Sequence, residues 1–559
     1  MGGDVIVDFR DRSSTTDIEV DLCIIGAGPA GITIARGFLG GATSVCLVES
    51  GGIDAENRVQ ELNSAASIGP LRFDARNSRL RAFGGSSEVW GGGCIPLSNI
   101  DFETRDWVPH SGWPLSYEQL LPYYERAKTL FHVQEYGFVE GSFLGDVPRP
   151  PPVFDESLLV NRKFVSNAVR FGTEYLDELR RAENIRVLLH ASLVAFDASP
   201  DARAVSQARI ASLDGRKGVV RAKQYVLACG GIENARLLLL SDSAGGGGLG
   251  NAHDVVGRYF MDHPSGRIGK IHASDPEIVT RPYDRSAAKG TGWVIPELCV
   301  SDAGQRSMRL LNARARPVAV EGDVPKGLQA LRRLRQGLRR PTRGERQAAV
   351  LESAMDDGSA ARDGIVQRSR AADATLLGLA GQATKVALGA GDIAQAWARK
   401  LADKPAVAAT AADIDGYFEQ APNPDSRIVL GDELDALGQR KAQVDWRLTP
   451  LDWHTYRVSA RIFGAELART CSGRFELAPW LQEGDDATPP LHGTSHHLGT
   501  TRMDPDPRKG VVDLHSRVHG VDNLYVAGSS VFPTGGWAFP TFTIVAMSLR
   551  LVEYLQALL

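Results

Sequence analysis

The chain has 559 residues, which exceeds the ~250–300 residues at which a single hydrophobic core stops growing, so we expect at least two domains. Hydrophobic residues make up 43% and charged residues 23%, as in ordinary globular proteins. A formal net charge of −4 argues against a global attraction to nucleic acid or acidic membranes. The first 20 residues lack the pattern of a signal peptide, and no apolar run reaches the ~18 residues of a membrane span. We therefore expect a soluble, cytoplasmic protein without a membrane span.

The cysteines do not form a metal-binding pattern. None of the six lies within metal-ligand spacing of another, which argues against a zinc site and against an iron–sulfur cluster. They are Cys23, Cys46, Cys94, Cys229, Cys299 and Cys471. We expect no metal.

The first predicted elements are a strand, a glycine turn and a helix. The apolar run Val20–Ile25 ends at "GAGPAG", and residues 32–38 read as the start of a helix. Gly26 would make the tight turn, Gly28 would let the backbone approach a pyrophosphate, and Gly31 would let helix and strand pack closely. This order of elements is typical of a dinucleotide-binding fold.

A second strand, residues 44–48, ends in Glu49, which is placed to accept hydrogen bonds from a ribose. An acid here argues against a ribose 2′-phosphate and leaves FAD and NAD both possible. The strand–turn–helix at 224–241 lacks the three-glycine spacing and is interpreted as sheet scaffold. A single dinucleotide site favours a tightly held flavin over a flavin–NAD pair.

Four stretches resemble the glucose–methanol–choline (GMC) flavoprotein oxidoreductases, near the branch of pyranose oxidases and bacterial sugar dehydrogenases. They are the glycine turn at 26–31, "GGSSEVWGGG" at 84–93, "SHHLGTTRM" at 495–503 and "NLYVAGSSVFPTGGWAFPTFTIVAMSLRL" at 523–551. The resemblance implies an α/β fold: a Rossmann-like FAD-binding domain of p-hydroxybenzoate hydroxylase-like architecture, followed by a sheet-based α+β substrate domain.

The resemblance also implies domain boundaries. We expect a discontinuous FAD-binding domain at 1–264 and 484–559, and a substrate domain at 265–483. In the latter, 418–430 ("FEQAPNPDSRIVL") resembles the family and 444–448 ("VDWRL") alternates as a strand does.

The residues that the resemblance assigns to FAD are spread over five segments. Val89 stands where some pyranose oxidases have a histidine bonded to the flavin, so we expect FAD to be non-covalent. The expected cofactor-binding residues are Gly26, Gly28, Gly31, Glu49, Arg81, Gly85, Ser86, Gly91, Gly92, Val194, Gly528, Ser529 and Pro540.

The adjacent histidines of "SHHLGT" are interpreted as one base and one neighbour. The family's reaction removes a hydroxyl proton while a hydride leaves for flavin N5, and a neutral imidazole suits the proton transfer. The family pattern places His496 at the base. His497 is expected to turn away and make a structural hydrogen bond, although it stays a candidate substrate contact. A shared metal is disfavoured because adjacent strand residues point to opposite faces.

The sequence departs from the family at Phe539, where a second catalytic histidine or asparagine is usual. A phenyl ring neither donates nor accepts an ordinary hydrogen bond. Gln420 and Trp537 are the remaining candidate substrate contacts, and for Gln420 an ordinary strand-edge glutamine is an equal alternative.

Residues 325–405 change in composition. Leu328, Leu331, Leu334 and Leu338 recur at helical spacing among arginines, and an alanine-rich segment with Leu376, Leu379, Val386, Ile393 and Trp397 follows. A helical insertion with a solvated basic face is the plain interpretation; contact with an anionic membrane or with an electron acceptor are the alternatives.

Together these features predict an FAD-dependent oxidoreductase that oxidises a CH–OH group, most plausibly of a polyol, sugar or glycoside. The electron acceptor would be oxygen, a quinone or a redox partner protein. The change at Phe539 keeps two alternatives open: a lyase that retains FAD without redox chemistry, and a flavin-binding protein without catalysis.

Overall fold

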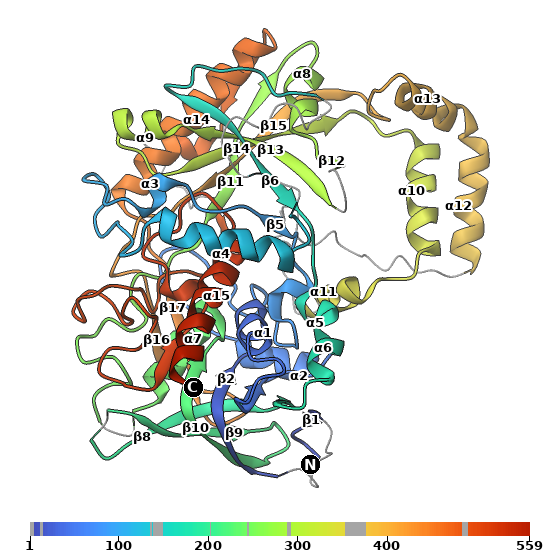
Figure 1. Ribbon diagram of the computed structural model, residues 1–559. Helices are drawn as coiled ribbons and strands as arrows, with labels where there is room; N and C mark the ends of the chain where they lie inside the picture. The colour runs from blue at the N-terminus through green and yellow to red at the C-terminus, as the bar shows by residue number, and fades with distance from the viewer. Residues whose placement is uncertain are drawn as a thin grey trace.

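The computed structural model describes residues 5–11, 15–134, 137, 149–201, 203–242, 245–287, 292–352, 376–482 and 490–559. Within them the chain forms two large sheets, a small third sheet, and a group of helices that stands to one side (Figure 1). The predicted α/β fold is confirmed.

The first sheet has eight strands and contains the predicted glycine turn. Its central strands β2, β3, β10 and β20 are mutually parallel where they pair, so their carboxyl ends meet at one edge. In spatial order the strands are β1 (Ile6–Asp8), β7 (Ile185–Leu189), β3 (Val45–Val48), β2 (Asp17–Ile25), β10 (Lys217–Leu227), β9 (Val205–Ala211) and β8 (Ser192–Ala198), and β20 (Leu524–Val526) pairs with β10.

Four helices lie beside the first sheet and the glycine turn. α1 (Pro29–Arg36) starts three residues before the predicted helix because Pro29 fits the first helical turn. It lies against α15 (Pro540–Leu558), and α15 lies against α4 (Tyr117–Leu130). The predicted scaffold unit at 224–241 is the end of β10 followed by α7 (Gly230–Leu240).

The second sheet is antiparallel, and α14 (Pro450–Thr470) covers one face (Figure 1). Its strand order is β18 (Arg474–Leu477), β11 (Pro264–His272), β15 (Ala409–Phe418), β14 (Ala313–Glu321), β13 (Trp293–Val300), β6 (Leu159–Ser166) and β5 (Gly93–Cys94). The short strands β12 (Ser286–Ala287) and β19 (His492–Gly493) pair with β13 and β11.

Strands from both predicted domains share the second and third sheets. β5 and β6 belong to the second sheet although they precede residue 265. The three-stranded sheet of β16 (Arg427–Leu434), β17 (Arg440–Asp445) and β4 (Ala66–Ser67) instead contributes Ile428 and Val444 to the core of the first sheet. The predicted strand at 444–448 is β17, which ends at Asp445. The predicted boundary between residues 483 and 484 lies outside the described residues.

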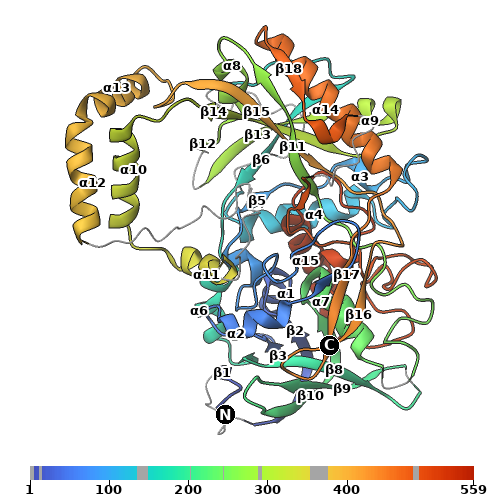
Figure 2. The same ribbon diagram turned by 180° about the vertical axis from the view of Figure 1, so that it is seen from behind.

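The predicted insertion is helical where it is described. α10 (Lys326–Leu338), α12 (Leu376–Leu388) and α13 (Ala390–Leu401) stand beside the two sheets, whereas α11 (Arg343–Glu352) packs back onto the first-sheet half (Figure 2). Residues 353–375 and the side chains of Leu376 and Leu379 lie outside the described part. The remaining helices are short: α2 (Asn57–Gln60), α3 (Asn99–Phe102), α5 (Phe171–Glu174), α6 (Leu176–Arg180), α8 (Glu277–Thr280) and α9 (Asp302–Met308).

Candidate active site

The glycine turn after β2 has both a packed side and an open side. A Cβ at Gly31 would lie 1.9 Å from the carbonyl oxygen of Gly26, and one at Gly26 would lie 2.6 Å from that of Ala228, so neither position admits a side chain. A Cβ at Gly28 would meet nothing within 4 Å. The open side adjoins the N-terminus of α1, where backbone N–H groups and the helix dipole favour a phosphate.

Glu49 ends β3 beside this turn and is buried. Its carboxylate accepts hydrogen bonds from the backbone N–H groups of Ala27 (2.9 Å) and Gly51 (2.8 Å). Burial raises its pKa, and these hydrogen bonds oppose the shift. Glu49 thus orders the glycine turn; a ribose contact stays a prediction.

The segment "GGSSEVWGGG" lies against the same turn. The N–H of Gly84 donates to the carbonyl of Ala27 (2.8 Å), and a Cβ at Gly85 would lie 3.1 Å from the Cα of Gly28. Ser86 accepts a hydrogen bond from the N–H of Leu80 at 3.2 Å. A Cβ at Gly91 would meet nothing within 4 Å, so this stretch also borders open space.

One glycine and one valine of this segment have packing roles. Gly92 has a φ of +78°, and a Cβ there would lie 2.5 Å from the Cα of Ala168. Val89 is buried in a small apolar cluster that includes Ala348 and Leu351 of α11. A helix of the insertion therefore covers the position at which the family's covalent histidine would stand.

Four further predicted cofactor residues lie on other strands, turns or helix ends. The register of β8 against β9 shifts between Leu193 and Ala195, so Val194 occupies a bulge where ladder pairing is interrupted. Gly528 follows β20 with a φ of +110°, and a Cβ there would meet one atom, 4.0 Å away. Ser529 donates its hydroxyl to the carbonyl of His497 (2.6 Å), and Pro540 opens α15.

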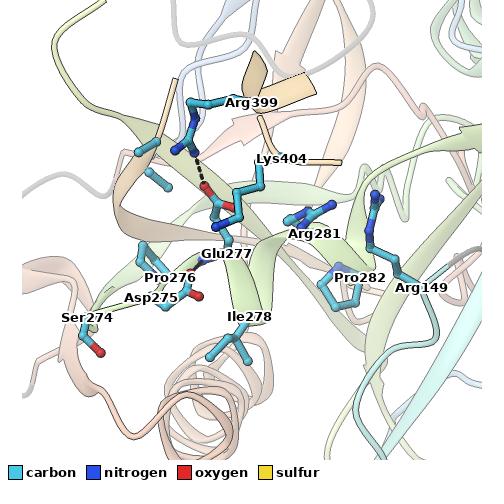
Figure 3. Close-up of a pocket in the computed structure, with 12 residues that line it drawn as sticks. Arg149, Ser274, Asp275, Pro276, Glu277, Ile278, Arg281, Pro282, Arg399 and Lys404 are labelled. Carbon is cyan, nitrogen blue, oxygen red and sulfur yellow. Dashed lines mark hydrogen bonds and ion pairs between the residues drawn. The ribbon is translucent and has the colours of Figure 1, made fainter. Parts of the chain in front are cut away.

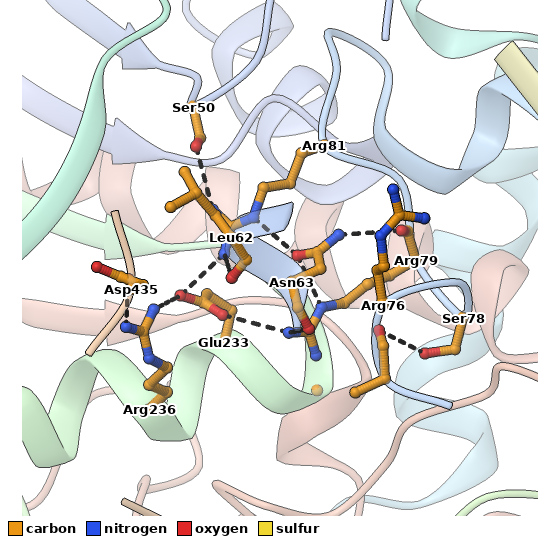
Figure 4. A network of polar contacts seen from close by, with 12 residues as sticks. Ser50, Leu62, Asn63, Arg76, Ser78, Arg79, Arg81, Glu233, Arg236 and Asp435 are labelled. Atoms are coloured by element: carbon orange, nitrogen blue, oxygen red, sulfur yellow. Dashed lines mark hydrogen bonds and ion pairs between the residues drawn. The ribbon is translucent and has the colours of Figure 1, made fainter. Parts of the chain in front are cut away.

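Arg81 belongs to a buried polar network centred on Glu233 of α7 (Figure 4). Its guanidinium lies 3.0 Å from Glu233 and donates to Asn63 (2.7 Å) and Ser50 (3.1 Å). Arg79 and Arg236 also pair with Glu233. Burial would raise the pKa of Glu233, but the three guanidinium groups hold it well below its usual range. Arg81 therefore ties the loop to α7.

His496 lies next to a second histidine that the sequence prediction missed. The Nδ1 atoms of His496 and His263 are 3.0 Å apart, and the Nε2 of His263 is 3.0 Å from the carbonyl oxygen of Gly536. The hydroxyl of Thr494 lies 2.7 Å from the Nδ1 of His496. His263 immediately precedes β11, so 233 residues of chain separate the two rings.

These contacts assign the tautomers of both rings. A carbonyl only accepts, so His263 carries its proton on Nε2 and leaves Nδ1 as an acceptor. His496 then donates its own Nδ1–H to His263 and shares it with the Thr494 hydroxyl, which donates to the carbonyl of His263 (3.1 Å). The Nε2 of neutral His496 consequently bears a lone pair, which is what a base requires.

Asp262 fixes the backbone on which both histidines are carried. Its Oδ1 accepts N–H groups from His263 (2.7 Å), His496 (2.9 Å) and Thr494 (3.1 Å). Burial raises the pKa of Asp262 to about 6. The ionised carboxylate therefore organises the site at neutral pH.

Both histidines are held neutral. Burial lowers the pKa of His496 well below its ordinary value, and His263, Arg314 and His497 lower it further. Burial, with Arg314, lowers the pKa of His263 to about 4. At neutral pH His496 is therefore an unprotonated imidazole.

Phe539 occupies a packed position beside His496, with ring centroids 5.5 Å apart. Its ring also stacks on the guanidinium of Arg314 (4.5 Å) and meets Phe164 edge-on (4.8 Å). Arg314 pairs with the buried Glu297. The phenyl ring thus covers a cation where the family's hydrogen-bonding residue would stand.

His497 points away from His496 into an aromatic environment. Its ring packs against Phe73 and Phe260, with centroids 5.3 and 6.1 Å away. Within the described chain, its buried Nε2 has no hydrogen-bond partner. The turn away from the flavin and the structural hydrogen bond stay predictions. Burial, with Arg79 nearby, lowers its pKa to about 3.

The other two predicted substrate contacts are engaged with the protein. Gln420 is 1% exposed; its Oε1 accepts from Trp446 (2.9 Å) and the N–H of Asp262 (3.1 Å), and its amide nitrogen donates to the carbonyls of Arg447 (3.0 Å) and Phe260 (3.4 Å). The amide has no group left over, so these contacts describe a structural glutamine. Trp537 donates to Ser98 at 3.0 Å.

A small void beside His263 is lined mainly by polar side chains from both halves of the molecule. Its walls comprise His263, Asn312, Ala313, Arg314, Tyr417, Phe418, Glu419 and Trp537. Glu419 forms a fully buried bidentate pair with Arg105 (2.7 and 3.0 Å). The second sheet therefore supplies a polar wall next to the histidine pair.

The chain is similar in sequence to known oxidoreductases. Residues 422–548 match the family model described as GMC oxidoreductase. The 6'''-hydroxyparomomycin C oxidase of Streptomyces lividus is 24% identical over 96% of this chain and 91% of its own. The fructose dehydrogenase large subunit of Gluconobacter japonicus is 25% identical over 67% of this chain and 54% of its own.

The fold is also that of solved flavoenzymes. The crystal structure of a formate oxidase superposes with a TM-score of 0.55 at 15% identity, covering 97% of this chain and 99% of the other. The family match and the named relatives support an FAD-dependent oxidoreductase acting on CH–OH groups. The chain is thus similar to GMC oxidoreductases, as its motifs predicted, and residues 422–548 match that family's model.

The residues present fit FAD. Gly28, Gly91 and Gly528 border space that a side chain would fill, whereas Gly26 and Gly31 are packed. Gly28 and Gly528 follow strands whose carboxyl ends meet at one edge of the first sheet, and the segment of Gly91 contacts the same turn through Gly84. Such folds bind dinucleotides at this edge. In the described residues no helix is long and apolar enough to span a membrane, and no cluster of three metal ligands occurs.

Proposed function

We propose that the protein oxidises a hydroxyl group of a sugar or glycoside, with His496 as the base and non-covalent FAD as cofactor. The single observation that carries the proposal is the chain from the Gly536 carbonyl through His263 to His496, since it leaves a lone pair on the Nε2 of His496. FAD, when bound, supplies the acceptor for the hydride.

His496 takes the hydroxyl proton at Nε2. The imidazolium that forms keeps its Nδ1–H on the acceptor nitrogen of His263 and on the Thr494 hydroxyl, so its positive charge is hydrogen-bonded from the start. Because the pKa of His496 is low, the proton is also readily released afterwards.

Phe539 excludes water beside the base instead of binding the substrate hydroxyl. Its ring lies against His496 and shields Arg314, so it lowers the local dielectric where the proton moves. Substrate hydroxyls then depend on the second sheet, whose polar wall includes Arg314 and Tyr417. Such a wall suits a polyhydroxylated substrate, and the likeness to a 6'''-hydroxyparomomycin C oxidase and to a fructose dehydrogenase is consistent with it.

Val89 supports a non-covalent flavin because a valine offers no atom for a flavin bond and here packs against α11. Gln420, whose amide is already saturated, has no assigned contact with the substrate in this proposal.

The experiment is anaerobic bleaching of the flavin by a panel of monosaccharides, amino sugars and glycosides. Wild type should bleach with at least one, and His496→Ala should retain FAD yet bleach roughly 10²–10⁴-fold more slowly. The matched control is His497→Phe, which replaces the neighbouring imidazole with a ring suited to its aromatic surroundings. Its flavin should bleach at nearly the wild-type rate. A wild type that never bleaches would favour a lyase or a non-catalytic flavoprotein.

A further inference from the structure

The outward face of α13 is apolar. Successive residues of an α-helix turn by about 100°, so five exposed residues of α13 share one sector of roughly 100°. They are Ala390, Ala394, Trp397, Ala398 and Leu401, with Trp397 54% and Leu401 86% exposed. Leu388, 84% exposed at the end of α12, adjoins this helix. We call these six residues the α13 face.

The opposite side of α13 is anchored to the body, which fixes the direction of the α13 face. Ala396 is buried in a cluster with Leu328 of α10 and Val407. Arg399 donates to Glu277 of α8 at 3.1 Å, an ion pair visible in Figure 3. Figures 1 and 2 show α13 standing away from both sheets on the same side as α10 and α12.

The pocket drawn in Figure 3 does not account for the α13 face. It lies on the anchored side, and three of its four cations pair with acids: Arg399 with Glu277, and Arg149 and Arg281 with Asp403. The exposed apolar residues point elsewhere.

Positive charge surrounds the α13 face. Lys385 lies one turn before Leu388, and Lys400 borders Trp397 and Leu401; both are exposed. Residues 325–405 have 15 Lys and Arg against 8 Asp and Glu, a formal charge of +7, whereas the rest of the chain carries −11. An anionic surface would therefore attract this part of the molecule and repel the remainder.

The size of the α13 face favours a lipid surface over a protein partner. Three large side chains and three alanines expose on the order of 500 Å², less than the ~800 Å² per partner of a stable protein interface. Membrane-surface helices need only a few buried apolar side chains supplemented by lysines and arginines, and tryptophan is enriched at the headgroup level.

We propose that the α13 face docks the protein on an anionic lipid bilayer, with Trp397, Leu401 and Leu388 entering the headgroup boundary and the neighbouring lysines contacting acidic headgroups. The protein lies on the surface and does not span it. The attachment is reversible, and it is independent of the reaction at His496.

The test is co-sedimentation of the FAD-loaded protein with vesicles. One set contains phosphatidylcholine with roughly a third phosphatidylglycerol, and the other contains phosphatidylcholine alone. Wild type should bind the anionic set at low salt, bind it less at high salt, and bind the neutral set weakly. The fraction of the variant Trp397→Ser/Leu401→Ser that binds the anionic vesicles should correspond to a partition coefficient about tenfold or more below that of wild type, because two apolar side chains no longer enter the lipid.

The matched control is Leu434→Ser, which removes a leucine that is 58% exposed on β16, away from α13, and should bind as wild type does. Flavin content should be equal in all variants. Equal binding by wild type and Trp397→Ser/Leu401→Ser, or no binding to anionic vesicles, would overturn the proposal. So would a wild-type dimer that the double variant dissociates, because the face would then be an interface between copies.

Discussion

The relation between His263 and His496 predicts a graded effect on catalysis. His263→Leu places an apolar Cδ where Nδ1 accepts from His496, whereas His263→Asn places an amide oxygen or nitrogen at that position. Both variants lose the Nε2–H that donates to the Gly536 carbonyl. The pair therefore differs chiefly in the one acceptor that sets the tautomer of His496.

The expected magnitude follows from a single neutral hydrogen bond. Such a bond contributes a net ~0.5–1.5 kcal/mol, which corresponds to roughly 2–13-fold in the population of the correct tautomer. The Thr494 hydroxyl, 2.7 Å from the same nitrogen, retains part of the preference. We expect the rate of flavin reduction to fall about 2–13-fold in His263→Leu and to recover to within about twofold of wild type in His263→Asn.

The assay is single-turnover anaerobic flavin reduction at saturating substrate, with FAD content and thermal unfolding measured for each variant. Equal stability losses in the two variants would isolate the effect on His496. A loss of a hundredfold or more in His263→Leu would mean that His263 is itself the base, and equal rates in Leu and Asn variants would refute the tautomer argument.

Three further predictions concern neighbouring residues. Acid or heat denaturation should release FAD into the supernatant, because Val89 offers no atom for a covalent bond; flavin that stays with precipitated protein would contradict this. His497 is buried with a pKa lowered to about 3, so the folded protein binds fewer protons than the unfolded chain below the ordinary histidine pKa of ~6.5, and stability falls as the pH falls from there. In His497→Phe, the free energy of unfolding measured by chemical denaturation should fall by ~1.4 kcal/mol less per pH unit than in wild type. An unchanged pH dependence would refute the assignment of a low pKa to His497. Phe539→Asn should lower the free energy of unfolding by ~3 kcal/mol, because it removes the ring that packs on Arg314 and Phe164, while tightening binding of simple sugars; a variant of wild-type stability would show that the ring is not packed.

The parts of the fold that the sequence predicts are those encoded by local pattern. The turn at Gly26–Gly31 and the acid Glu49 follow from glycine spacing and strand periodicity, and they lie where that pattern requires. The pairing of β6 with β13 joins segments more than a hundred residues apart and leaves no mark in either segment.

The candidate site divides in the same way. His496 could be proposed from sequence because its motif is contiguous. Its partner His263 lies 233 residues away in "MDHP", and only the folded chain brings the two rings into contact. For Gln420 the sequence left a substrate contact and an ordinary strand-edge glutamine equally open, because a buried amide and an exposed one look alike in sequence; its four protein contacts favour the second. The stacking of Phe539 on Arg314 could not be predicted either, because Arg314 lies on β14 of the second sheet, far from Phe539 in sequence.

The measurement that tests the central claim most directly is the rate constant of anaerobic flavin reduction as a function of pH, for wild type and His496→Ala with the best sugar or glycoside. Neutral His496 is the active form, and its pKa lies well below the ordinary value. The carboxylate of Asp262, which orders the site when it is ionised, has a pKa of about 6. The wild-type rate should therefore rise with pH across the acidic range and stay constant from neutral into mildly alkaline pH. His496→Ala should be slower throughout, by roughly 10²–10⁴-fold on the plateau. Equal plateau rates in wild type and His496→Ala would contradict the assignment of His496 as the base.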